Sequence, residues 1–565
     1  MTKELENKIN FWKNNVNEKE LQEINEMSLD QLLDAFSTDI TFGTGGLRGI
    51  IGMGSNRMND YVIKKSTLGF GEYLLSIDKN AKERGVVISY DCRRCSRSFS
   101  ESAAGVLAAK GIKVYLFSSL RPTPELSFAV RHLKCIGGIM ITASHNPPEY
   151  NGYKVYDETG CQLVPEDADK VIERIDNIND MFSITSMSLE EGTQAGLIKE
   201  IDKEVDIPYL ENVKTIPVNK VDKKNISIVY TPLHGTGSVH MVNLLKEEGY
   251  NVTPVKEQMI PDGEFTTLKS PNPEEPTAFE YALKLGKEIN ADVLIATDPD
   301  ADRMGIAAKD ANGEYQLLTG NQTGAILLDY LAKFIPHTEN SYVYNTIVTS
   351  DISKAICEKY GLTLVQTLTG FKYIGEKANK IEGTDKSFFF GYEESYGYVI
   401  KPFVRDKDSF QATLLLAEVA SYYKSLGKTL INALEDIYKE FGYYLEGAHS
   451  ISLTGVEGAA RIKRIMNWFS NNPLHQVANH KIATVSDYNQ GISYDFNGLK
   501  EEIDLPKALV LKYTFVGGGW IALRPSGTEP KLKLYIAIKE KDYESAKEFI
   551  SQIKKEILSI IDNIK

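Results

Sequence analysis

Short apolar runs bounded by turn residues recur along the amino-terminal part of the chain. Residues 86–90, 114–117 and 136–141 are each rich in aliphatic or aromatic side chains, as expected for buried strands. The segments between these runs are long enough to hold helices. Parallel strands need such crossovers, so this spacing predicts a parallel α/β sheet.

The same succession of strand, turn and helix returns further along the chain. It is seen in residues 226–230 and 293–296, and again in residues 342–344, 362–364 and 388–390. Three sequential α/β units are the simplest account of this repetition.

The last stretch has a different pattern. Residues 509–515 and 520–523 flank a turn of three glycines, and apolar residues then alternate at Leu532, Leu534 and Ile536. A helix with one apolar face follows, formed by Ala546, Phe549, Ile550, Ile553 and Ile557. Hairpin-like spacing with a covering helix predicts an α+β domain with an antiparallel sheet.

The expected fold class is therefore α/β: three similar α/β domains with mixed sheets, followed by a smaller α+β domain with an antiparallel sheet. A chain of 565 residues is long enough for three to four domains. No Gly/Ser-rich linker marks their limits. The predicted domains are residues 1–203, 204–322, 323–445 and 446–565.

Charge and composition narrow the classes of partner. With 64 basic and 77 acidic residues, the net charge of −13 opposes non-specific binding to nucleic acid or to an anionic membrane. The first twenty residues predict an amphipathic helix with no signal-peptide core, and no apolar run reaches membrane-spanning length. Five cysteines without a regular framework suit a reducing compartment. We expect a cytoplasmic protein.

A stiff polar turn follows the apolar run 136–141. Ser144, His145 and Asn146 precede two consecutive prolines, which cannot donate backbone hydrogen bonds and restrict the residue before them. The turn thus holds the Ser144 hydroxyl in a defined position just past a strand end. An ordinary surface turn of Ser, Asn and Pro is the alternative.

An acidic motif follows the run 293–296 directly. In an extended segment alternate side chains share a face, so Asp298, Asp300 and Asp302 could converge on one hard cation. An EF-hand is excluded, because Arg303 stands where its glycine is needed and Lys309 where its bidentate Glu belongs. Few ligands from a short loop leave coordination sites open, as is typical of Mg²⁺. A solvated acidic turn is the alternative.

Three further loops carry polar groups beside glycines. Residues 41–49 hold four glycines and Arg48, and residues 391–398 combine glycines with Glu393 and Ser395 in a manner that suits sugar hydroxyls. Residues 524–530 join a guanidinium, two hydroxyls and a glycine, which can form an anion-binding nest. Each of these could also be a plain loop or β-turn.

Taken together, these motifs resemble those of the α-D-phosphohexomutase family, the phosphoglucomutases and phosphomannomutases. The match begins with the glycine-rich segment 41–49 and the string Thr-Ala-Ser-His-Asn-Pro-Pro at 142–148. It continues through Asp-Pro-Asp-Ala-Asp-Arg at 298–303, the loop 391–398 and Arg-Pro-Ser-Gly-Thr-Glu-Pro at 524–530. The motifs occur in order from about residue 41 to residue 533. The form Glu-Glu-Ser-Tyr-Gly-Tyr at 393–398 favours the phosphoglucomutase and phosphopentomutase branch.

The resemblance implies a role for each matched residue. Ser144 would carry a phosphoryl group and bind Mg²⁺ together with Asp298, Asp300 and Asp302, while Lys154 would assist proton transfer and Arg48 would face the active site. The implied substrate-binding residues are His145, Arg303, Lys372, Glu393, Ser395, Arg524, Ser526, Gly527 and Thr528, of which the last four would hold the non-reacting phosphate. The segment 405–408 is interpreted as structural, and Asp91, Arg93 and Ser96 as loop architecture.

The implied activity is interconversion of glucose 1-phosphate and glucose 6-phosphate, with glucose 1,6-bisphosphate as intermediate and activator. Mannose or pentose phosphates are alternative substrates, and a non-catalytic sugar-phosphate sensor is a different class of alternative. Tyr398 stands where some members have histidine, so a histidine role in proton transfer is in doubt. The expected partners are small sugar phosphates, with neither nucleic acid nor membrane. The sequence does not indicate an oligomeric state.

Overall fold

The computed structural model describes residues 1–43, 45–453, 455–525 and 531–564. The chain divides into two compact units that are interleaved in sequence. Unit 1 consists of Met1–Leu318, Ile374–Thr384 and Tyr396–Thr429, and unit 2 consists of Thr319–Tyr373, Asp385–Ser395 and Leu430–Lys565. Each unit is described by itself.

Unit 1 begins with three short helices in place of the single amphipathic helix that the sequence predicts. These are α1 (Lys3–Asn15), α2 (Glu18–Glu26) and α3 (Leu29–Phe36). The breaks have a local cause, because Asn17 and Ser28 each form a capping box with the helix that follows. Trp12 and Phe36 lie edge to face with ring centroids 5.6 Å apart, which joins α1 to α3.

The first sheet contains six strands in the order β1-β5-β4-β2-β3-β6. Their bounds are β1 Gly46–Ile50, β2 Val86–Tyr90, β3 Val114–Phe117, β4 Gly137–Ile141, β5 Tyr150–Asp157 and β6 Ile198–Ile201. The three apolar runs pair in parallel, as the spacing predicts. β5 runs antiparallel to both β4 and β1, which makes the sheet mixed.

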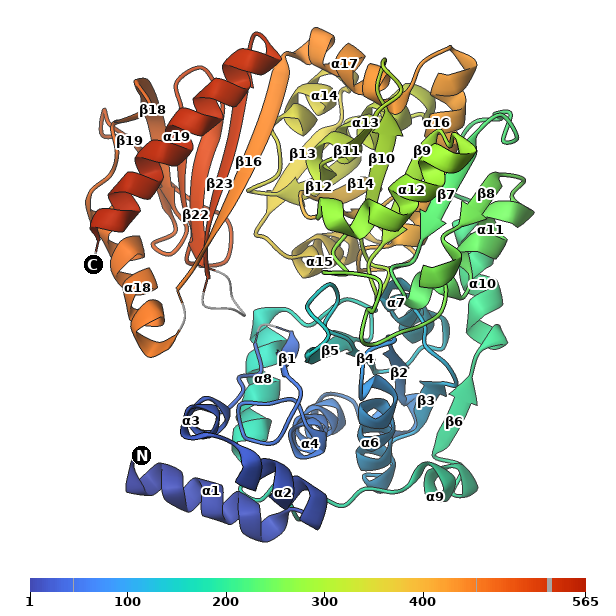
Figure 1. Cartoon of the computed structure of the whole chain (residues 1–565), viewed down its shortest axis with the longest axis vertical. Helices are drawn as coiled ribbons and strands as arrows, with labels where there is room; N and C mark the ends of the chain where they lie inside the picture. Colours follow the sequence, from blue (N-terminus) through green and yellow to red (C-terminus); the bar gives the residue numbers. More distant parts are fainter. Residues whose placement is uncertain (44, 454, 526–530, 565) are drawn as a thin grey trace. The chain divides into compact units, whose positions relative to one another are not determined.

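Helices cover both faces of this sheet. α4 packs with α6 and α8 on one face, and α7 packs with α10 on the other (Figure 1). Their bounds, with those of two shorter helices, are α4 Asp60–Ile77, α5 Ala81–Arg84, α6 Ser96–Ala109, α7 Thr123–His132, α8 Pro165–Asp176, α9 Leu189–Gln194 and α10 Lys203–Val213. The core between them is aliphatic and aromatic, with Phe70, Ile88 and Ile139 fully buried.

The second sheet of unit 1 has the order β11-β10-β9-β7-β8. β7 pairs in parallel with β8 and β9, whereas β10 runs antiparallel to β9 and β11. The bounds are β7 Ser227–Thr231, β8 Asn251–Pro254, β9 Val293–Thr297, β10 Met304–Lys309, β11 Tyr315–Leu318, α11 Met241–Glu247 and α12 Glu280–Ile289. Strand β15 (Gly397–Val399) and helix α16 (Ser409–Ser425) complete the unit, with α16 against β9 and β10.

Unit 2 contains the third sheet, in which β12 lies between β13 and β14 and pairs in parallel with both. The bounds are α13 Gly320–Phe334, β12 Ser341–Thr346, α14 Ile352–Tyr360, β13 Thr363–Thr367, β14 Ser387–Glu393 and α17 Leu430–Phe441. Helix α15 (Phe371–Ile381) begins in unit 2 and ends in unit 1.

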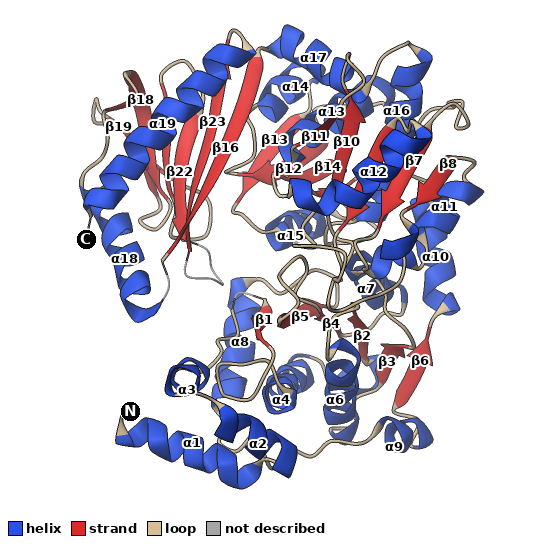
Figure 2. Cartoon of the chain, in the orientation of Figure 1, coloured by secondary structure: helices blue, strands red, loops and turns tan. Residues whose placement is uncertain are grey.

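The last sheet has the order β16-β23-β22-β21-β18-β19-β20, with β17 beside β18, and its described strand pairs are antiparallel. The long helix α19 lies along β16 and β23 (Figure 2). The bounds are β16 Tyr443–Ser452, α18 Gly455–Asn471, β17 Gln476–Val477, β18 His480–Asp487, β19 Ile492–Asp495, β20 Lys500–Glu502, β21 Leu511–Phe515, β22 Trp520–Pro525, β23 Lys531–Glu540 and α19 Tyr543–Asn563.

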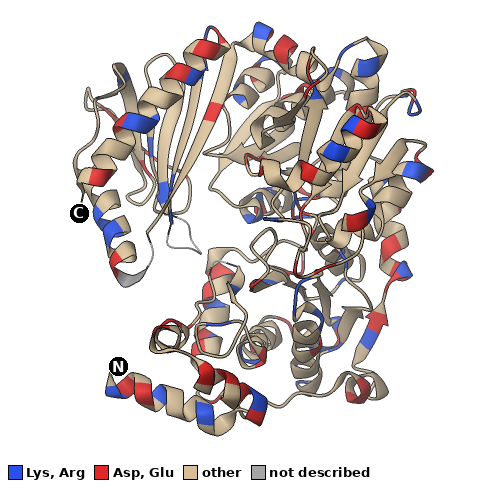
Figure 3. Ribbon diagram, viewed as in Figure 1, with Lys and Arg blue, Asp and Glu red and all other residues tan. Residues whose placement is uncertain are grey.

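This architecture confirms the predicted fold class: three α/β domains with mixed sheets, followed by a domain with an antiparallel sheet and helices. The three predicted limits between the four domains remain predictions. Acidic and basic residues are interspersed along α1 of unit 1 and α19 of unit 2 (Figure 3). Within the described residues, no helix combines the length and the apolar character needed to cross a bilayer.

Gly152 in β5 packs closely against the strand end that precedes the Ser144 turn, and it leaves no room for a side chain. A Cβ atom there would lie 2.4 Å from the carbonyl oxygen of Thr142 and 2.9 Å from that of Leu47, and neither backbone atom can move freely within the sheet. Overpacking of this kind costs about 1–3 kcal/mol. We therefore expect Gly152→Ala to lower the midpoint of thermal unfolding, measured by circular dichroism.

Gly43→Ala is the matched control, because a Cβ at Gly43 meets only the Gly46 carbonyl, at an ordinary 3.6 Å. Its unfolding midpoint should stay close to that of the unmodified protein. Equal midpoints for the two variants would contradict the proposed steric role of Gly152.

Candidate active site

The turn between β4 and β5 holds Ser144 in a strained backbone conformation. Its φ of 51° lies in the left-handed region, which a residue with a Cβ seldom occupies. The Ser144 amide donates to Oγ1 of Thr142 at 2.8 Å, and Thr142 Oγ1 in turn donates to Oδ2 of Asp91 at 2.6 Å. Strain of this kind persists only where the surroundings over-determine the conformation, and it clusters at functional sites.

Arg93 is the main support of this turn. Its Nη2 donates to the Ser144 carbonyl at 2.6 Å, and its Nη1 donates to the carbonyls of Pro147 and Tyr150 at 2.8 and 3.1 Å. Arg93 also forms a fully buried ion pair with Asp91, at 3.3 Å. Burial raises the pKa of Asp91, although Arg93 opposes that shift. These contacts agree with the interpretation of Asp91 and Arg93 as loop architecture.

The acidic motif forms a tight turn after β9, whereas the sequence predicted an extended segment. The amide of Ala301 donates to the Asp298 carbonyl at 2.9 Å, and Ala301 has a φ of 50°. The carboxylates converge all the same: Asp298, Asp300 and Asp302 are buried, with ligand atoms within 4.8 Å of one another. The turn brings them together because it folds the chain back, so alternation along a strand was the wrong reason for a correct expectation.

Two helix starts hold the acidic turn in place. At the beginning of α7, the Thr123 amide donates to the Asp300 carbonyl at 2.9 Å and the Thr123 hydroxyl donates to Asp300 Oδ2 at 2.9 Å. At the beginning of α16, the Ser409 hydroxyl donates to the Ala301 carbonyl at 2.6 Å. The turn is thus braced by two helices that are far apart in the sequence.

The serine turn and the acidic turn meet directly. The Ser144 hydroxyl donates to Oδ2 of Asp298 at 2.7 Å, and Nδ1 of His145 lies 3.2 Å from the same hydroxyl oxygen. Burial, with the cations Arg303 and Arg48 nearby, holds the pKa of His145 well below its usual range. The His145 imidazole is therefore neutral near pH 7.

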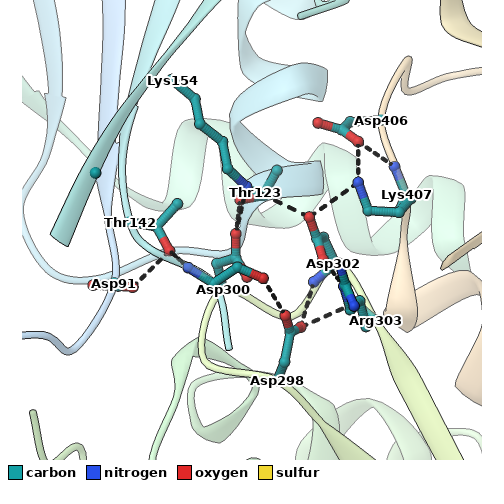
Figure 4. Close-up of polar contacts among 12 residues, drawn as sticks. Asp91, Thr123, Thr142, Lys154, Asp298, Asp300, Asp302, Arg303, Asp406 and Lys407 are labelled. Atoms are coloured by element: carbon teal, nitrogen blue, oxygen red, sulfur yellow. Dashed lines mark hydrogen bonds and ion pairs between the residues drawn. The ribbon is translucent and has the colours of Figure 1, made fainter. Parts of the chain in front are cut away.

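Two lysines face the acidic turn (Figure 4). Lys154 Nζ lies 2.9 Å from Asp300 Oδ2 and 3.6 Å from Asp302 Oδ2. Lys407 Nζ lies 3.2 Å from the same Asp302 oxygen and 2.9 Å from Asp406. The segment 405–408, which was interpreted as structural, thus places Lys407 against the acidic turn. Signals for this contact were the alternation of cation and carboxylate in the segment and the place of its family counterpart near the sugar.

Burial and mutual repulsion set the protonation of the carboxylates. Burial first, and then the charges of Asp300 and Asp302, raise the pKa of Asp298 well above its usual range. Burial also acts to raise the pKa of Asp300, but the ammonium of Lys154 outweighs it, so this pKa lies below the usual range. Burial acts to lower the pKa of Lys154, but Asp300 and Asp302 outweigh it and the pKa is raised. Lys154 thus keeps its proton at neutral pH.

The acidic turn fits a divalent cation. Oδ1 of Asp300 and Oδ1 of Asp302 are buried and have no hydrogen-bond partner, and the three carboxylates offer only oxygen ligands. Hard cations such as Mg²⁺ and Ca²⁺ prefer this donor set. Nη1 of Arg303 forms an ion pair with Glu274 at 2.6 Å, and its Nε lies 3.8 Å from Asp302. The Arg303 guanidinium therefore lies at the edge of the carboxylate cluster.

Arg48 also contacts the serine turn. It lies on β1, opposite Gly152 of β5, and its Nη1 donates to Oδ1 of Asn146 at 3.0 Å. The structure thus brings together in unit 1 the predicted site residues Ser144, His145, Lys154, Arg48, Asp298, Asp300, Asp302 and Arg303. Tyr398, in β15 of the same unit, is buried.

Unit 2 holds the remaining predicted residues. The Gly370 amide donates to Oε1 of the buried Glu393 at 2.8 Å, so the segment before α15 and the end of β14 lie together. Lys372 is buried over the ring of Tyr373, with Nζ 5.3 Å from its centroid. Ser395 lies two residues past β14, and Arg524 lies near the end of β22. Ser526, Gly527 and Thr528 fall outside the described residues.

Comparison with protein families assigns four successive domains to the chain. Residues 39–181, 207–313 and 319–441 match the models of phosphoglucomutase/phosphomannomutase alpha/beta/alpha domains I, II and III. Residues 481–555 match the phosphoglucomutase/phosphomannomutase C-terminal domain.

Curated proteins resemble the chain over most of its length. A phosphoglucomutase of Staphylococcus epidermidis is 39% identical over 516 residues, covering 91% of this chain and 93% of that protein. A phosphoglucomutase of Staphylococcus aureus is 37% identical over 544 residues, covering 96% of this chain and 97% of that protein.

Solved structures share the fold at lower identity. Parafusin (pp63), a phosphoglucomutase of Paramecium, has a TM-score of 0.68 at 19% identity and covers 93% of this chain and 96% of its own. A phosphoglucomutase/phosphomannomutase family protein of Burkholderia thailandensis has a TM-score of 0.67 at 16% identity and covers 92% and 97%. With four matching domains and relatives above 35% identity, the chain belongs to the phosphoglucomutase/phosphomannomutase family of phosphohexomutase enzymes.

Proposed function

We propose that this enzyme interconverts glucose 1-phosphate and glucose 6-phosphate by way of a phosphorylated Ser144. The observation that carries the proposal is the 2.7 Å contact between the Ser144 hydroxyl and Asp298, inside a buried turn of three aspartates. A hydroxyl in such a setting needs a cation before it can hold a phosphoryl group, because four negative groups would otherwise share one buried site.

The proposed reaction conserves the phosphoryl group. A free hydroxyl of the sugar phosphate attacks phosphorus, the bond from phosphorus to Ser144 Oγ breaks, and glucose 1,6-bisphosphate forms. The bisphosphate then returns its other phosphoryl group to Ser144, which leaves the isomeric monophosphate. In each half-reaction one hydroxyl loses a proton and one oxygen gains it. Glucose 1,6-bisphosphate would thus serve as intermediate and also as activator of dephosphorylated enzyme.

We propose that the cation is Mg²⁺. It would be bound by Asp298, Asp300, Asp302 and a phosphoserine oxygen. When bound, it would offset the negative charge of the phosphoryl group. We propose that Lys154 acts in proton transfer. Its Nζ keeps its proton beside Asp300, and it could donate this proton to Ser144 Oγ when the bond from Oγ to phosphorus breaks. Arg48 and Arg303 supply further positive charge, and His145 would contact the substrate.

Recognition of the sugar would fall to unit 2. Glu393 and Ser395 offer oxygen acceptors for ring hydroxyls, and Lys372 offers a cation nearby in sequence. Arg524, with Ser526, Gly527 and Thr528, would bind the phosphate that does not react. The choice of glucose is supported by the relatives at 37–39% identity, both named phosphoglucomutase. A sensor without activity is disfavoured because Ser144, the three aspartates and Lys154 are all present and in contact.

The preferred substrate can be tested directly. We expect glucose 1-phosphate to have the highest kcat/KM in a coupled assay that also includes mannose 1-phosphate, ribose 1-phosphate and glucosamine 1-phosphate. A single hydroxyl hydrogen-bonded to a charged group such as Glu393 is worth roughly 1.5–3 kcal/mol, or about 10- to 150-fold in kcat/KM. Equal or higher kcat/KM for mannose or ribose phosphate would assign the enzyme to that substrate class instead.

The phosphoryl carrier can be tested by mass. Intact-mass measurement and peptide mapping should find one phosphoryl group on Ser144, and phosphatase-treated enzyme should regain activity when glucose 1,6-bisphosphate is added. Ser144→Ala should abolish turnover, because it removes the hydroxyl that contacts Asp298 and would carry the phosphoryl group. Ser98→Ala, which alters an exposed serine on α6, is the control and should keep full activity. Full activity without phosphate on Ser144 would refute the mechanism.

The binding of Mg²⁺ at the acidic turn can be tested by substitution of Asp300. Asp300→Asn removes one carboxylate charge and replaces one acceptor oxygen by an NH₂ donor, but it keeps the shape of the side chain. Binding of Mg²⁺ and turnover should fall by roughly 10- to 100-fold or more, the loss typical for altered metal sites. Isothermal titration with Mg²⁺ and activity after chelation measure both effects. Asp176→Asn, at an exposed position of α8, should behave like the unmodified enzyme. Unchanged activity in excess chelator would exclude a metal at this site.

A further inference from the structure

Unit 1 contains a second cluster of acidic and imidazole side chains, formed by Glu125, Asp206 and His240. Glu125 lies in the first turn of α7, Asp206 in the first turn of α10, and His240 immediately before α11. One ligand atom from each residue lies within 4.8 Å of those from the other two. None of the three residues belongs to the acidic turn or to the serine turn.

The Glu125 carboxylate is the anomaly in this cluster. Glu125 is 0% exposed, and neither Oε1 nor Oε2 has a hydrogen-bond partner. A buried carboxylate without donors is strongly disfavoured, so such a group is normally paired, protonated or bound to a metal. Burial first, and then the contact with Asp206, raise the pKa of Glu125 well above its usual range.

The neighbouring guanidinium of Arg121 is already ion-paired with other carboxylates. Arg121 donates to both oxygens of Asp206, at 2.9 and 3.0 Å, and its Nη2 also bonds Asp202 at 3.0 Å. Asp408 adds a further buried carboxylate whose charge reaches Glu125, and its Oδ2 has no hydrogen-bond partner. If Glu125, Asp206 and Asp408 were all ionised, their negative charge would therefore exceed the positive charge of Arg121. The surplus must be neutralised by protons or by a bound cation.

His240 favours a cation over a proton. Its Nε2 is buried without a hydrogen-bond partner and lies 3.4 Å from Asp206 Oδ2. A proton on Glu125 would let this group donate to Asp206, but Nε2 of His240 would keep only its 3.4 Å contact with Asp206, which is longer than a usual N–H···O hydrogen bond. One metal ion would satisfy all three groups, and the partly exposed side chain of His240 offers a route of entry from solvent.

We propose that Glu125, Asp206 and His240 bind a divalent transition-metal ion of the Zn²⁺ class. One imidazole nitrogen with two carboxylates suits Zn²⁺, Co²⁺ or Mn²⁺, whereas Mg²⁺ prefers oxygen ligands alone. Arg121 would be the outer partner that orients the Asp206 carboxylate. The ion would link α7 of the first sheet to α10 and to the start of α11 in the second sheet. It is thus a structural site, separate from the cation at the acidic turn.

Metal counting tests the proposal on the full chain. Protein stripped with a chelator is dialysed against Zn²⁺ and then against metal-free buffer, and bound zinc is measured by atomic emission. Zn²⁺ can also enter the acidic turn, so the unmodified chain should hold two ions. His240→Gln and Asp300→Asn should each hold one, and the double variant none. His475→Gln, at an exposed histidine, is the matched control and should hold two. A His240→Gln variant with the full count would overturn the proposal.

A second measurement separates the metal from a shared proton. In the Asp300→Asn background, Co²⁺ should produce visible ligand-field absorption and raise the midpoint of thermal unfolding. Both effects should disappear with Glu125→Gln or His240→Gln. If Co²⁺ has neither effect and Glu125→Gln unfolds at the same temperature as its parent, then Glu125 carries a proton and the proposal is wrong.

Discussion

The active site of unit 1 depends on the burial of three like charges in one turn. Asp298, Asp300 and Asp302 repel one another most strongly where water is excluded, and no arrangement of three bare carboxylates would be stable there. Lys154 and Lys407 reduce this repulsion from two different segments, and their separate contacts with the Asp302 carboxylate join β5 to the chain before α16. The negative charge that the lysines leave uncompensated would favour a bound cation, and such a cation could in turn offset the charge of a phosphoryl group.

Backbone strain accompanies this concentration of charge. Ser144 and Ala301 both have left-handed φ values, and each lies in the turn that carries reacting or ligand groups. Neither conformation is favoured locally, so each is held by distant contacts: Arg93 for the serine turn, and Thr123 with Ser409 for the acidic turn. The cost of about 1–3 kcal/mol for each strained residue is the reason that the supports are buried and multiply bonded.

The two acidic clusters of unit 1 illustrate different solutions to one electrostatic problem. At the acidic turn, two lysines approach the carboxylates directly, and the donor set is oxygen alone. At Glu125, the neighbouring Arg121 guanidinium is bound to Asp206 and Asp202, and an imidazole nitrogen completes the set. Because the type of donor and the uncompensated charge differ, the two clusters would favour different classes of metal ion.

The sequence by itself determined the elements and the loops that carry chemistry. The apolar runs predicted β2, β3 and β4, and the polar string after β4 marked the serine turn, because burial and turn chemistry depend on residues close together in the chain. Motif resemblance identified the family. Only the tertiary structure decided that Lys407 reaches Asp302, that the acidic turn is bent at Ala301, and that Glu125, Asp206 and His240 converge. These outcomes depend on side chains about 35 to more than 100 residues apart, whose proximity follows from the packing of whole sheets and helices and has no local signature.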